Sequence, residues 1–567
     1  MSTPADPQDE LFQKQHSDKI FDLLASFDSI MNSTGRVPTM AEVLAAQSTS
    51  VSEALQLTDM ECAPSPYPRR QRNPHTLSVN FTKYTPGPIT HLPVEMLMEI
   101  FNYATWLGDV NTFESSWNVF DPSWRPCIIS RVCHQWRAVA IGNCPKIWTN
   151  FSLDWDWCRW DYMNDPVALL SLVLSRSGNE PLFFRLEEAD GKDIPEDEED
   201  EEEDPTEMVL YKDRDAAVTE EIIRILVDQC HRWQIVSFSI PASLFHLLSL
   251  IRGQLHALVD FDFNEAFIGG LPFKSRLPSR IVSDILDGAP LLKSLALSSS
   301  FDVERPKITI IPRMCPKLRS FTDLREVGVG EELHQHFLDI VGNLPGLRDF
   351  DVRLTGFFPI ANPRIVNTSI TQLSVCSRSF LRSIILPKLK DVHLHGPAPG
   401  VHLYIHDGVA SLYDLVTHSG CSLTSLSISN CAVDERLIFI LRASPEITTL
   451  SLSFREWQGD SVQTIPSLIA ELSLGKAEPA LVPNLHRFSL GLPKGSSLLL
   501  DMGLLGSNLV DSIENRWRKG SLRSVSVHIG HPWVDTDGGF TLTRACCERL
   551  ARMEKEGLTV VLLPPPL

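Results

Sequence analysis

The stretch LPGLRDFDV, residues 344–352, contains the pattern that decides the fold of most of this 567-residue chain. Its fourth, seventh and ninth residues are apolar, and a proline lies just upstream of them. The stretches CPKLRSFTD (315–323) and LPKLKDVHL (386–394) follow the same order, although the first ends on an aspartate. Because side chains alternate between the two faces of a β-strand, the last apolar pair points to one side. The pattern therefore predicts a short strand with one buried face.

The same pattern recurs eleven times, at intervals of 19 to 38 residues. The copies begin at Trp233, Leu258, Leu292, Leu318, Leu347, Ile370, Leu389, Leu423, Ile447, Leu485 and Leu522. Helix-like stretches such as ELHQHFLDIVGNL lie between them. One strand–helix unit cannot bury its apolar face alone, so neighbouring units must stack. We expect an α/β array over residues 218–567, with parallel strands inside and helices outside; a βα-rich globular domain is the alternative.

Residues 89–150 carry a second ordered set of motifs, and these are helical. The stretch ITHLPVEMLMEIFNYATWL begins with a threonine that can cap a helix and a proline suited to its first turn. After an interrupting loop at 108–123, apolar residues from Ile128 to Val139 mark the face of one further helix. The unit closes with a turn at Pro145 and an anchor at Trp148.

The order of these residues resembles the F-box, a short helical module. The matches in the first helix are Leu92, Pro93, Glu95, Leu97, Ile100 and Phe101. The later matches are Val132, Cys133, Trp136, Arg137, Ala140, Pro145, Ile147 and Trp148. The loop at 108–123 is longer than the family pattern and should bulge at the surface, since lengthening a loop costs little free energy.

The resemblance implies that the module binds a Skp adaptor, which links through a cullin scaffold to a RING subunit. The Skp-adaptor-binding residues on the first helix are then expected to be Leu92, Pro93, Leu97, Ile100 and Phe101. Further residues that either join this surface or hold it in shape are Val132, Trp136 and Trp148. The array after the module resembles the divergent leucine-rich repeats that follow F-boxes in fungal proteins. Asn430 is the one good copy of the asparagine that closes such a repeat.

The remaining segments are predicted to be less ordered. Residues 1–88 are rich in Ser, Thr and Pro and should be mostly disordered, apart from one amphipathic helix near residues 9–32. That helix either binds a partner or packs back on its own domain. Residues 151–217 form a linker and first repeat, in which residues 167–186 should be a helix, a turn and a strand. Within it, residues 187–207 hold fourteen acidic residues and one lysine, and should be a disordered loop or a lure for a basic partner.

Composition limits the classes of partner. The formal net charge is −20 and no basic run occurs, so a nucleic-acid partner is not expected. No apolar run is long enough for a transmembrane helix, and the N-terminus lacks the features of a signal peptide. The chain should therefore be intracellular, in the cytoplasm, the nucleus or both. Its twelve scattered cysteines should then be mostly free thiols.

A search for catalytic motifs finds none. The phosphate-binding loop, the dinucleotide fingerprint, the nucleophile elbow and the His-Glu-x-x-His metal motif do not occur. The spacing of Cys127, Cys133, His134 and Cys144 fits no zinc-site pattern, and His393 and His395 alone make a poor metal site. We expect no cofactor, no metal and no catalytic residue in this chain.

These predictions lead to one function and two alternatives. The chain should be the substrate-recognition adaptor of a Skp–cullin–F-box ubiquitin ligase, with the module binding the Skp adaptor and the repeat array binding a protein substrate. The first alternative is an F-box–Skp scaffold that recruits no cullin. The second is an enzyme whose site forms only in three dimensions.

Overall fold

The computed structural model falls into two compact units, Met1–Arg185 and Leu186–Leu567. The N-terminal helix expected near 9–32, most of the 108–123 loop and most of the acidic loop lie outside the described residues. The described residues are 92–105, 118–121, 124–155, 165–188, 205–240, 242–265, 286, 288–299, 315–327, 331–354, 358–396, 408–454, 461–473, 481–492, 502–529 and 542–563.

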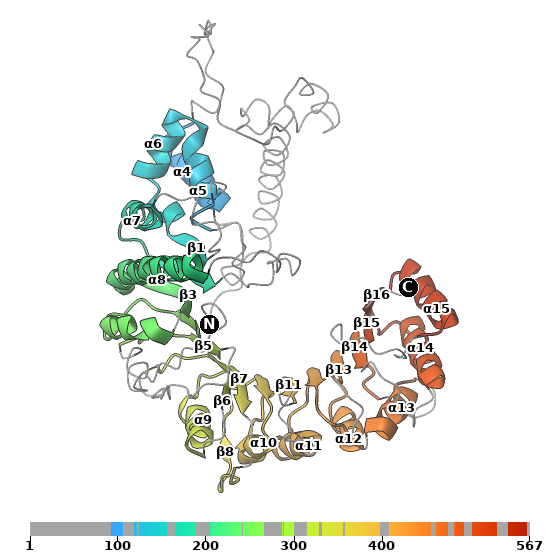
Figure 1. The fold of residues 1–567 in the computed structure, drawn as a ribbon. Helices are drawn as coiled ribbons and strands as arrows, with labels where there is room; N and C mark the ends of the chain where they lie inside the picture. Colours follow the sequence, from blue (N-terminus) through green and yellow to red (C-terminus); the bar gives the residue numbers. More distant parts are fainter. Residues whose placement is uncertain are drawn as a thin grey trace, which may run out of the picture. The chain divides into compact units, whose positions relative to one another are not determined.

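The first unit begins with a set of short helices (Figure 1). Their bounds are α4 (Val94–Thr105), α5 (Arg125–Val132), α6 (His134–Gly142) and the 3-10 helix η3 (Pro145–Trp148). The prediction of one continuous helix from Ile128 to Val139 is wrong, because Cys133 is extended (φ −158°, ψ 172°) and separates α5 from α6. The Cys133 sulfur accepts a hydrogen bond from the Trp136 N–H at 3.4 Å and so caps α6.

A strand–helix–strand segment follows this module. It consists of β1 (Asn150–Trp155), α7 (Pro166–Arg176) and β2 (Leu182–Glu188). Helix α7 is capped by Asp165, whose side chain accepts a hydrogen bond from the Ala168 N–H at 2.8 Å. The helix, turn and strand expected over 167–186 are confirmed.

The second unit alternates strands and helices. Its main-sheet strands are β3 (Trp233–Ile240), β4 (Asp260–Glu265), β5 (Ser294–Ser299), β6 (Ser320–Val327), β7 (Asp349–Leu354), β9 (Gln372–Val375), β11 (Asp391–His395), β12 (Ser425–Ser429), β13 (Thr449–Ser453), β14 (Arg487–Leu492), β15 (Ser524–Ile529) and β16 (Thr559–Leu563). Its α-helices are α8 (Pro205–Asp228), α9 (Glu331–Asn343), α10 (Arg378–Ser383), α11 (Gly408–Ser419), α12 (Arg436–Ala443), α13 (Ser461–Leu472), α14 (Met502–Arg518) and α15 (Arg544–Lys555). Smaller elements are the 3-10 helices η7 (Cys230–Arg232) and η8 (Ala242–Ile251), and a two-stranded sheet of β8 (Ile365–Val366) and β10 (Ile384–Ile385).

The main-sheet strands of this unit lie in chain order from β3 to β16, and each recorded pairing is parallel. All eleven copies of the apolar pattern lie on these strands, which confirms the α/β array with parallel strands. Helices α9 to α15 lie together on one side of the strands (Figure 1). The pattern did not predict β16, where apolar residues occupy both faces at Val560 and Val561.

The register aligns one apolar position across the sheet. Phe321 pairs with Phe350, Phe350 with Leu373 and Leu373 with Val392, and each of these side chains is buried. The series continues through β12 to β15 with Leu426, Leu450, Phe488 and Val525. Because each strand buries its apolar side chains against those of its neighbours, the irregular intervals between copies are taken up outside the strands.

Polar side chains satisfy the backbone where the repeats turn. Asn367 is buried and donates from Nδ2 to the carbonyls of Val341 (2.8 Å) and Leu344 (3.1 Å). Its Oδ1 accepts from the Ser369 N–H at 2.8 Å and from the Ile370 N–H at 3.2 Å. Asn430, which the sequence marked as the turn-closing asparagine, directly follows β12 and adopts a left-handed backbone conformation (φ 56°), which asparagine tolerates in turns. A buried asparagine with four such bonds is therefore found at Asn367.

None of the helices described here is both long and apolar enough to cross a membrane.

A close backbone approach occurs where β11 ends. The Gly396 N–H donates to the Ser429 carbonyl at 2.6 Å, and a Cβ added at Gly396 would lie 1.8 Å from the Asn430 carbonyl oxygen. We expect Gly396→Ala to destabilise the chain by at least about 1–3 kcal/mol, because the backbone must move to admit the methyl group. The control is Gly346→Ala, where the nearest atom would be 3.9 Å away. Thermal unfolding followed by circular dichroism should show a lower melting temperature for Gly396→Ala alone, and equal temperatures for both variants would contradict the close approach.

Candidate docking surface

Helix α4 has a buried stripe that fixes it to its module. Leu97 and Phe101 are 0 % exposed, and Ala104 is also buried. These residues lie four and three positions apart, which places them on one side of the helix. Phe101 also contacts Trp136 of α6, with ring centroids 4.9 Å apart. The stripe therefore fixes the orientation of α4 in the module, and its residues are not part of the exposed surface of the helix.

A second apolar stripe of α4 faces solvent beside the first. Met96 is 51 % exposed, Tyr103 is 37 % exposed, and Ile100 between them is half-buried. Pro93, immediately before the helix, is exposed as well. The spacing 93, 96, 100 and 103 follows one face of an α-helix. Contiguous exposed apolar residues on a small module indicate an interface.

Trp148 holds the end of the module. Its side chain is 0 % exposed, and its Nε1 donates to the Ala140 carbonyl at 2.9 Å. Its ring meets that of Trp124 edge-on at 5.5 Å, and the Arg176 guanidinium lies 4.6 Å from the ring centroid. Such aromatic and cation–π contacts each contribute on the order of 1 kcal/mol.

The structure separates the eight expected docking residues into two groups. Half-buried or exposed ones, which lie at the surface, are Leu92, Pro93, Ile100, Val132 and Trp136. Fully buried ones are Leu97, Phe101 and Trp148. The three buried residues form the core of the module. A partner would therefore contact the exposed and half-buried residues, whose positions this core fixes. Met96 and Tyr103 were absent from the expected set, although their helical spacing from Ile100 was the signal that could have found them.

The second unit has a polar open face on its sheet, opposite the buried apolar positions. In register along it lie Ser237, Asp262, Ala296, Thr322, Asp351, Ser374, His393, Ser427, Ser451, Ser489 and Ser526. None of these side chains is fully buried. Most of these side chains carry a hydroxyl group, which can donate and accept hydrogen bonds.

A cluster of titratable groups occupies the middle of this face. The His395 ring lies between two hydroxyls, with Nε2 2.9 Å from Ser374 Oγ and Nδ1 3.2 Å from Ser429 Oγ. The His393 ring centroid is 3.8 Å away. Burial, with the charges of His393 and Arg353, lowers the pKa of His395 to about 4. Burial also raises the pKa of Asp351, which accepts a hydrogen bond from Ser374.

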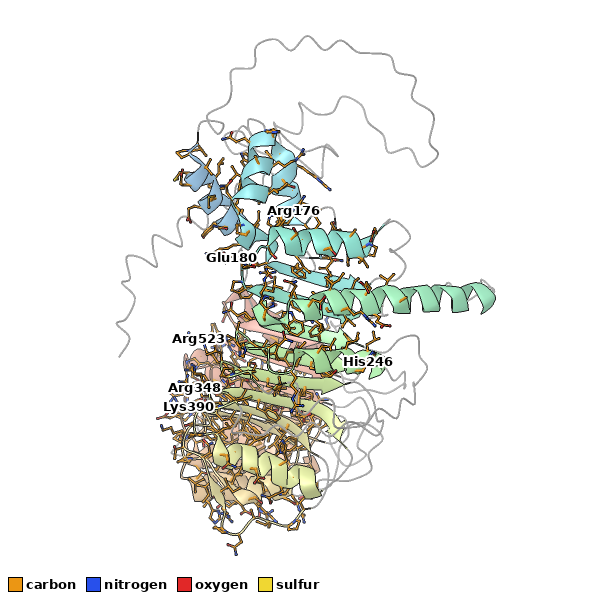
Figure 2. The ribbon with its side chains drawn as sticks, turned by 90° about the vertical axis from the view of Figure 1, so that its left-hand side faces the viewer. Arg176, Glu180, His246, Arg348, Lys390 and Arg523 are labelled. Atoms are coloured by element: carbon orange, nitrogen blue, oxygen red, sulfur yellow. The ribbon has the colours of Figure 1, made fainter. Side chains whose placement is uncertain are left out.

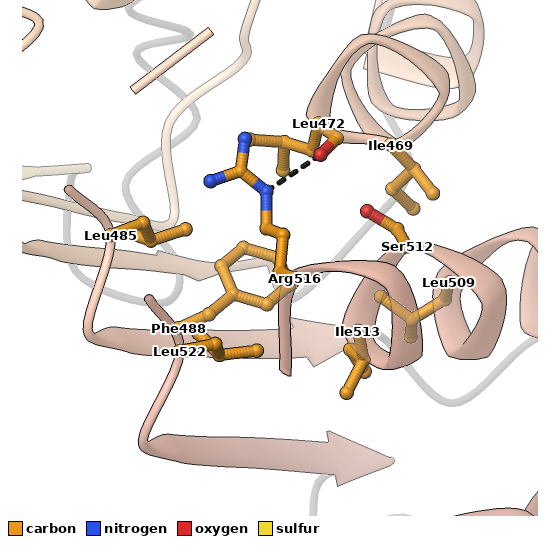
Figure 3. A pocket seen from close by; sticks show the side chains of 9 residues that line it. All are labelled: Ile469, Leu472, Leu485, Phe488, Leu509, Ser512, Ile513, Arg516 and Leu522. Atoms are coloured by element: carbon orange, nitrogen blue, oxygen red, sulfur yellow. Dashed lines mark hydrogen bonds between the residues drawn. The ribbon is translucent and has the colours of Figure 1, made fainter. Parts of the chain in front are cut away.

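The described residues can also be compared with the needs of a metal site and of a cavity that could hold a ligand. No group of three or more His, Cys, Asp or Glu residues suited to a metal is found among the described residues. The cavity between α13, α14 and their strands (Figure 3) is about 10 Å³, which is no more than one water molecule needs. Arg516 lies beside it and donates to the carbonyls of Leu472 (2.6 Å), Val482 (2.9 Å) and Leu481 (2.5 Å). Its guanidinium therefore satisfies backbone carbonyls at the end of α13 and in the segment before β14.

Neighbouring residues of α4 should respond differently to truncation. We expect Leu97→Ala to destabilise the helical module by about 2–5 kcal/mol, because it leaves a cavity under α4. Met96→Ala, at a half-exposed position, should change stability by no more than about 0.5 kcal/mol. Hydrogen exchange of peptides from residues 92–105, measured along a urea series, checks this. Similar protection in the two variants would show that the buried stripe is misassigned.

The pKa of His395 predicts a pH dependence. Its folded value of about 4 lies below the ordinary value of 6.5, so the unfolded chain binds a proton that the folded chain does not. The stability that the neutral ring contributes is complete above pH 6.5 and is lost as the pH falls towards 4. His395→Gln should therefore flatten the fall of melting temperature in this window. His418→Gln, at an exposed position, should leave the wild-type slope, and a wild-type slope in His395→Gln would refute the assignment.

No family model matches the sequence of this chain, and no curated protein matches it.

Proposed function

We propose that this chain is the substrate-recognition adaptor of a Skp–cullin–F-box ubiquitin ligase. In this proposal residues 92–148 bind the Skp adaptor, and the strand array of the second unit binds the protein to be modified. The chain itself supplies no catalytic group, and the transfer chemistry belongs to its partners. The resemblance of residues 92–148 to an F-box, stated from the sequence, supports the first half of the proposal.

The observation that carries the proposal is the exposed apolar stripe on α4. Pro93, Met96, Ile100 and Tyr103 present an apolar edge along the helix. Interfaces of protein complexes concentrate their binding free energy in a few such apolar anchors. The partner of the stripe is proposed to be the Skp adaptor because the same helix carries the Leu-Pro-x-Glu-x-Leu order of the F-box.

The interior of the module supports this role by keeping the stripe in place. Leu97 and Phe101 fix α4 from below, and Arg125 of α5 donates to the Ala104 carbonyl at 3.3 Å. Arg137 of α6 donates from Nε to the Ser130 carbonyl at 2.8 Å, which ties α6 to α5. A docking surface whose backbone is held in this way loses less conformational entropy on binding.

The second unit suits the other half of the proposal. Its open face carries hydroxyl, carboxylate and imidazole groups along parallel strands, and these can bind a polar polypeptide surface. An adaptor needs only to hold its substrate near the ligase, because tethering raises the local concentration of the substrate.

The exposed stripe provides the test of adaptor binding. Met96→Asp places a charge in the apolar surface without disturbing the buried stripe, so we expect affinity for a recombinant Skp adaptor to fall by about thirtyfold or more. The control is Leu172→Asp on α7, which changes a similarly exposed apolar residue (44 %) elsewhere in the same unit. Isothermal titration calorimetry with the full chain gives both affinities, and circular dichroism checks the fold.

Each result has a defined meaning. Wild-type binding that Met96→Asp weakens and Leu172→Asp preserves supports the proposal. No binding by the wild-type chain, or equal affinity of both variants, rejects it. A cullin should co-purify with the wild-type chain through the Skp adaptor; binding of the adaptor without any cullin would favour the scaffold that recruits none.

A further inference from the structure

Four cations form one row along the edge of the second unit where the strands begin. Lys293, Arg319, Arg348 and Lys390 each precede the first residue of a strand, β5, β6, β7 and β11. Backbone hydrogen bonds join them in sequence: Arg319 N–H to Lys293 O (2.7 Å), Arg348 N–H to Arg319 O (2.7 Å), and Lys390 to Arg348 through Thr371 (2.9 and 2.8 Å). Figure 2 shows Arg348 and Lys390 on this edge, with Arg523 farther along it.

Two further lysines extend the row into what we call the basic rim. The rim is defined as Lys293, Lys317, Arg319, Arg348, Lys388 and Lys390. All six side chains are exposed, and none makes an ion pair or side-chain hydrogen bond with another described residue. Asp349 and Asp391 directly follow two of these cations in the sequence, and the carboxylates of Asp260, Asp262 and Asp351 lie on the open face beside the rim. Arg348 lowers the pKa of the neighbouring Asp349, which burial raises more strongly.

The rim is unfavourable for the chain alone. Lys293, Arg319 and Arg348 precede three adjacent strands about 4.8 Å apart, and Lys390 lies one strand further on, beyond β9; like charges on neighbouring strands repel. The rest of this chain is acidic, with a net charge of −20, yet no described carboxylate pairs with the rim. An anionic partner would remove this repulsion and gain charge-assisted hydrogen bonds.

We propose that the basic rim binds an acidic segment of a partner polypeptide. From Lys293 to Lys390 the rim crosses five strands, or about 19 Å, which an extended segment of about six residues matches. This inference rests on the proposed function, because it gives the substrate-binding half of the adaptor a chemical preference. The substrate class is then a protein with a short run of Asp or Glu in an accessible segment.

The acidic run of this chain, Glu196–Asp204, follows the last residue of a strand, whereas the rim residues precede the first residues of their strands. It joins the end of β2 to the start of α8, and α8 runs back about 36 Å before β3 begins. Helix α8, green in Figure 2, projects away from the side that carries Arg348 and Lys390. The run is therefore attached at the end of the strands away from the rim, and a separate anionic partner is the proposed occupant.

Nucleic acid fits the rim less well than an acidic peptide. The open face directly beside the rim carries Asp260, Asp262, Asp349, Asp351 and Asp391. A polyphosphate chain longer than the rim would meet these carboxylates and the overall negative charge of the protein. A short acidic segment can remain on the rim alone.

The test measures binding of a labelled hexaglutamate peptide to the full chain by fluorescence polarisation. The rim variant is Arg348→Glu/Lys390→Glu. The matched control is Arg552→Glu/Lys555→Glu on α15, which makes the same change in net charge at exposed residues. We expect the rim variant to lose at least about tenfold in affinity and the control less than about twofold. A hexaglutamine peptide should not bind.

Other outcomes overturn the inference. These are no binding of the peptide by the wild-type chain, equal losses in both variants, or tighter binding of a single-stranded oligonucleotide than of the peptide. Deletion of residues 189–204 is the further check. A rise of about tenfold in affinity for the peptide would show that the acidic run of the chain occupies the rim, whereas unchanged affinity supports a separate partner.

Skp-adaptor binding, measured in parallel, separates this inference from the proposed function. The rim variant should bind the Skp adaptor like the wild-type chain, and Met96→Asp should bind the peptide like the wild-type chain. Loss of peptide binding in the rim variant alone therefore concerns only the rim, and loss of adaptor binding in Met96→Asp alone concerns only the module.

Discussion

The second unit depends on the in-register stacking of apolar side chains across its parallel strands. A five-residue strand such as β12 cannot bury Leu426 and Ile428 by itself, so it requires β11 and β13 on either side. Hydrophobic stabilisation is thereby shared between neighbours, each side chain contributing about 1.5–3 kcal/mol when fully buried. Loss of one strand would expose the apolar faces of two others, so contacts between neighbouring strands govern the stability of such an array.

This constraint explains the placement of the buried polar groups. Where one repeat turns into the next, backbone groups leave the sheet and need other partners. Ser419 Oγ accepts from the Leu386 N–H at 2.9 Å, and Ser444 Oγ accepts from the Leu423 N–H at 3.1 Å. Asn367 and Arg516 do the same for carbonyl groups. Burial lowers the pKa of Arg516 to about 10, so its guanidinium remains charged at neutral pH and can hold three carbonyls at once.

The helical module follows the opposite principle, because its interior is small and its surface carries the proposed interaction. Leu97, Phe101 and Trp148 use their full side chains for packing. The apolar residues left over on α4 cannot be buried in so small a unit, and they form the stripe proposed to bind the Skp adaptor. The two units thus separate the proposed tasks: one presents an apolar helix face, and the other presents polar and charged groups along a sheet.

The sequence by itself determined the strands of the array from β3 to β15 and the helical character of the module. Local periodicity is sufficient for this, because whether a side chain is buried in a strand or helix follows from spacings of two, three or four residues. It indicated one helix where Cys133 separates two, since a single extended residue does not alter the apolar spacing. It also placed Leu97 and Phe101 on the docking surface, because spacing alone does not say which of two adjacent stripes is covered.

Only the tertiary structure decided the basic rim. Lys293, Arg319, Arg348 and Lys390 lie 26, 29 and 42 residues apart in the sequence, so no basic run marks them. Each follows the first leucine of a copy of the apolar pattern, and that shared position was the one signal available. Parallel pairing then brings the first three positions to adjacent strands about 4.8 Å apart, with Lys390 one strand further on, beyond β9. A chain with a net charge of −20 thereby acquires a row of unpaired cations, because register depends on the apolar residues and not on the charges carried beside them.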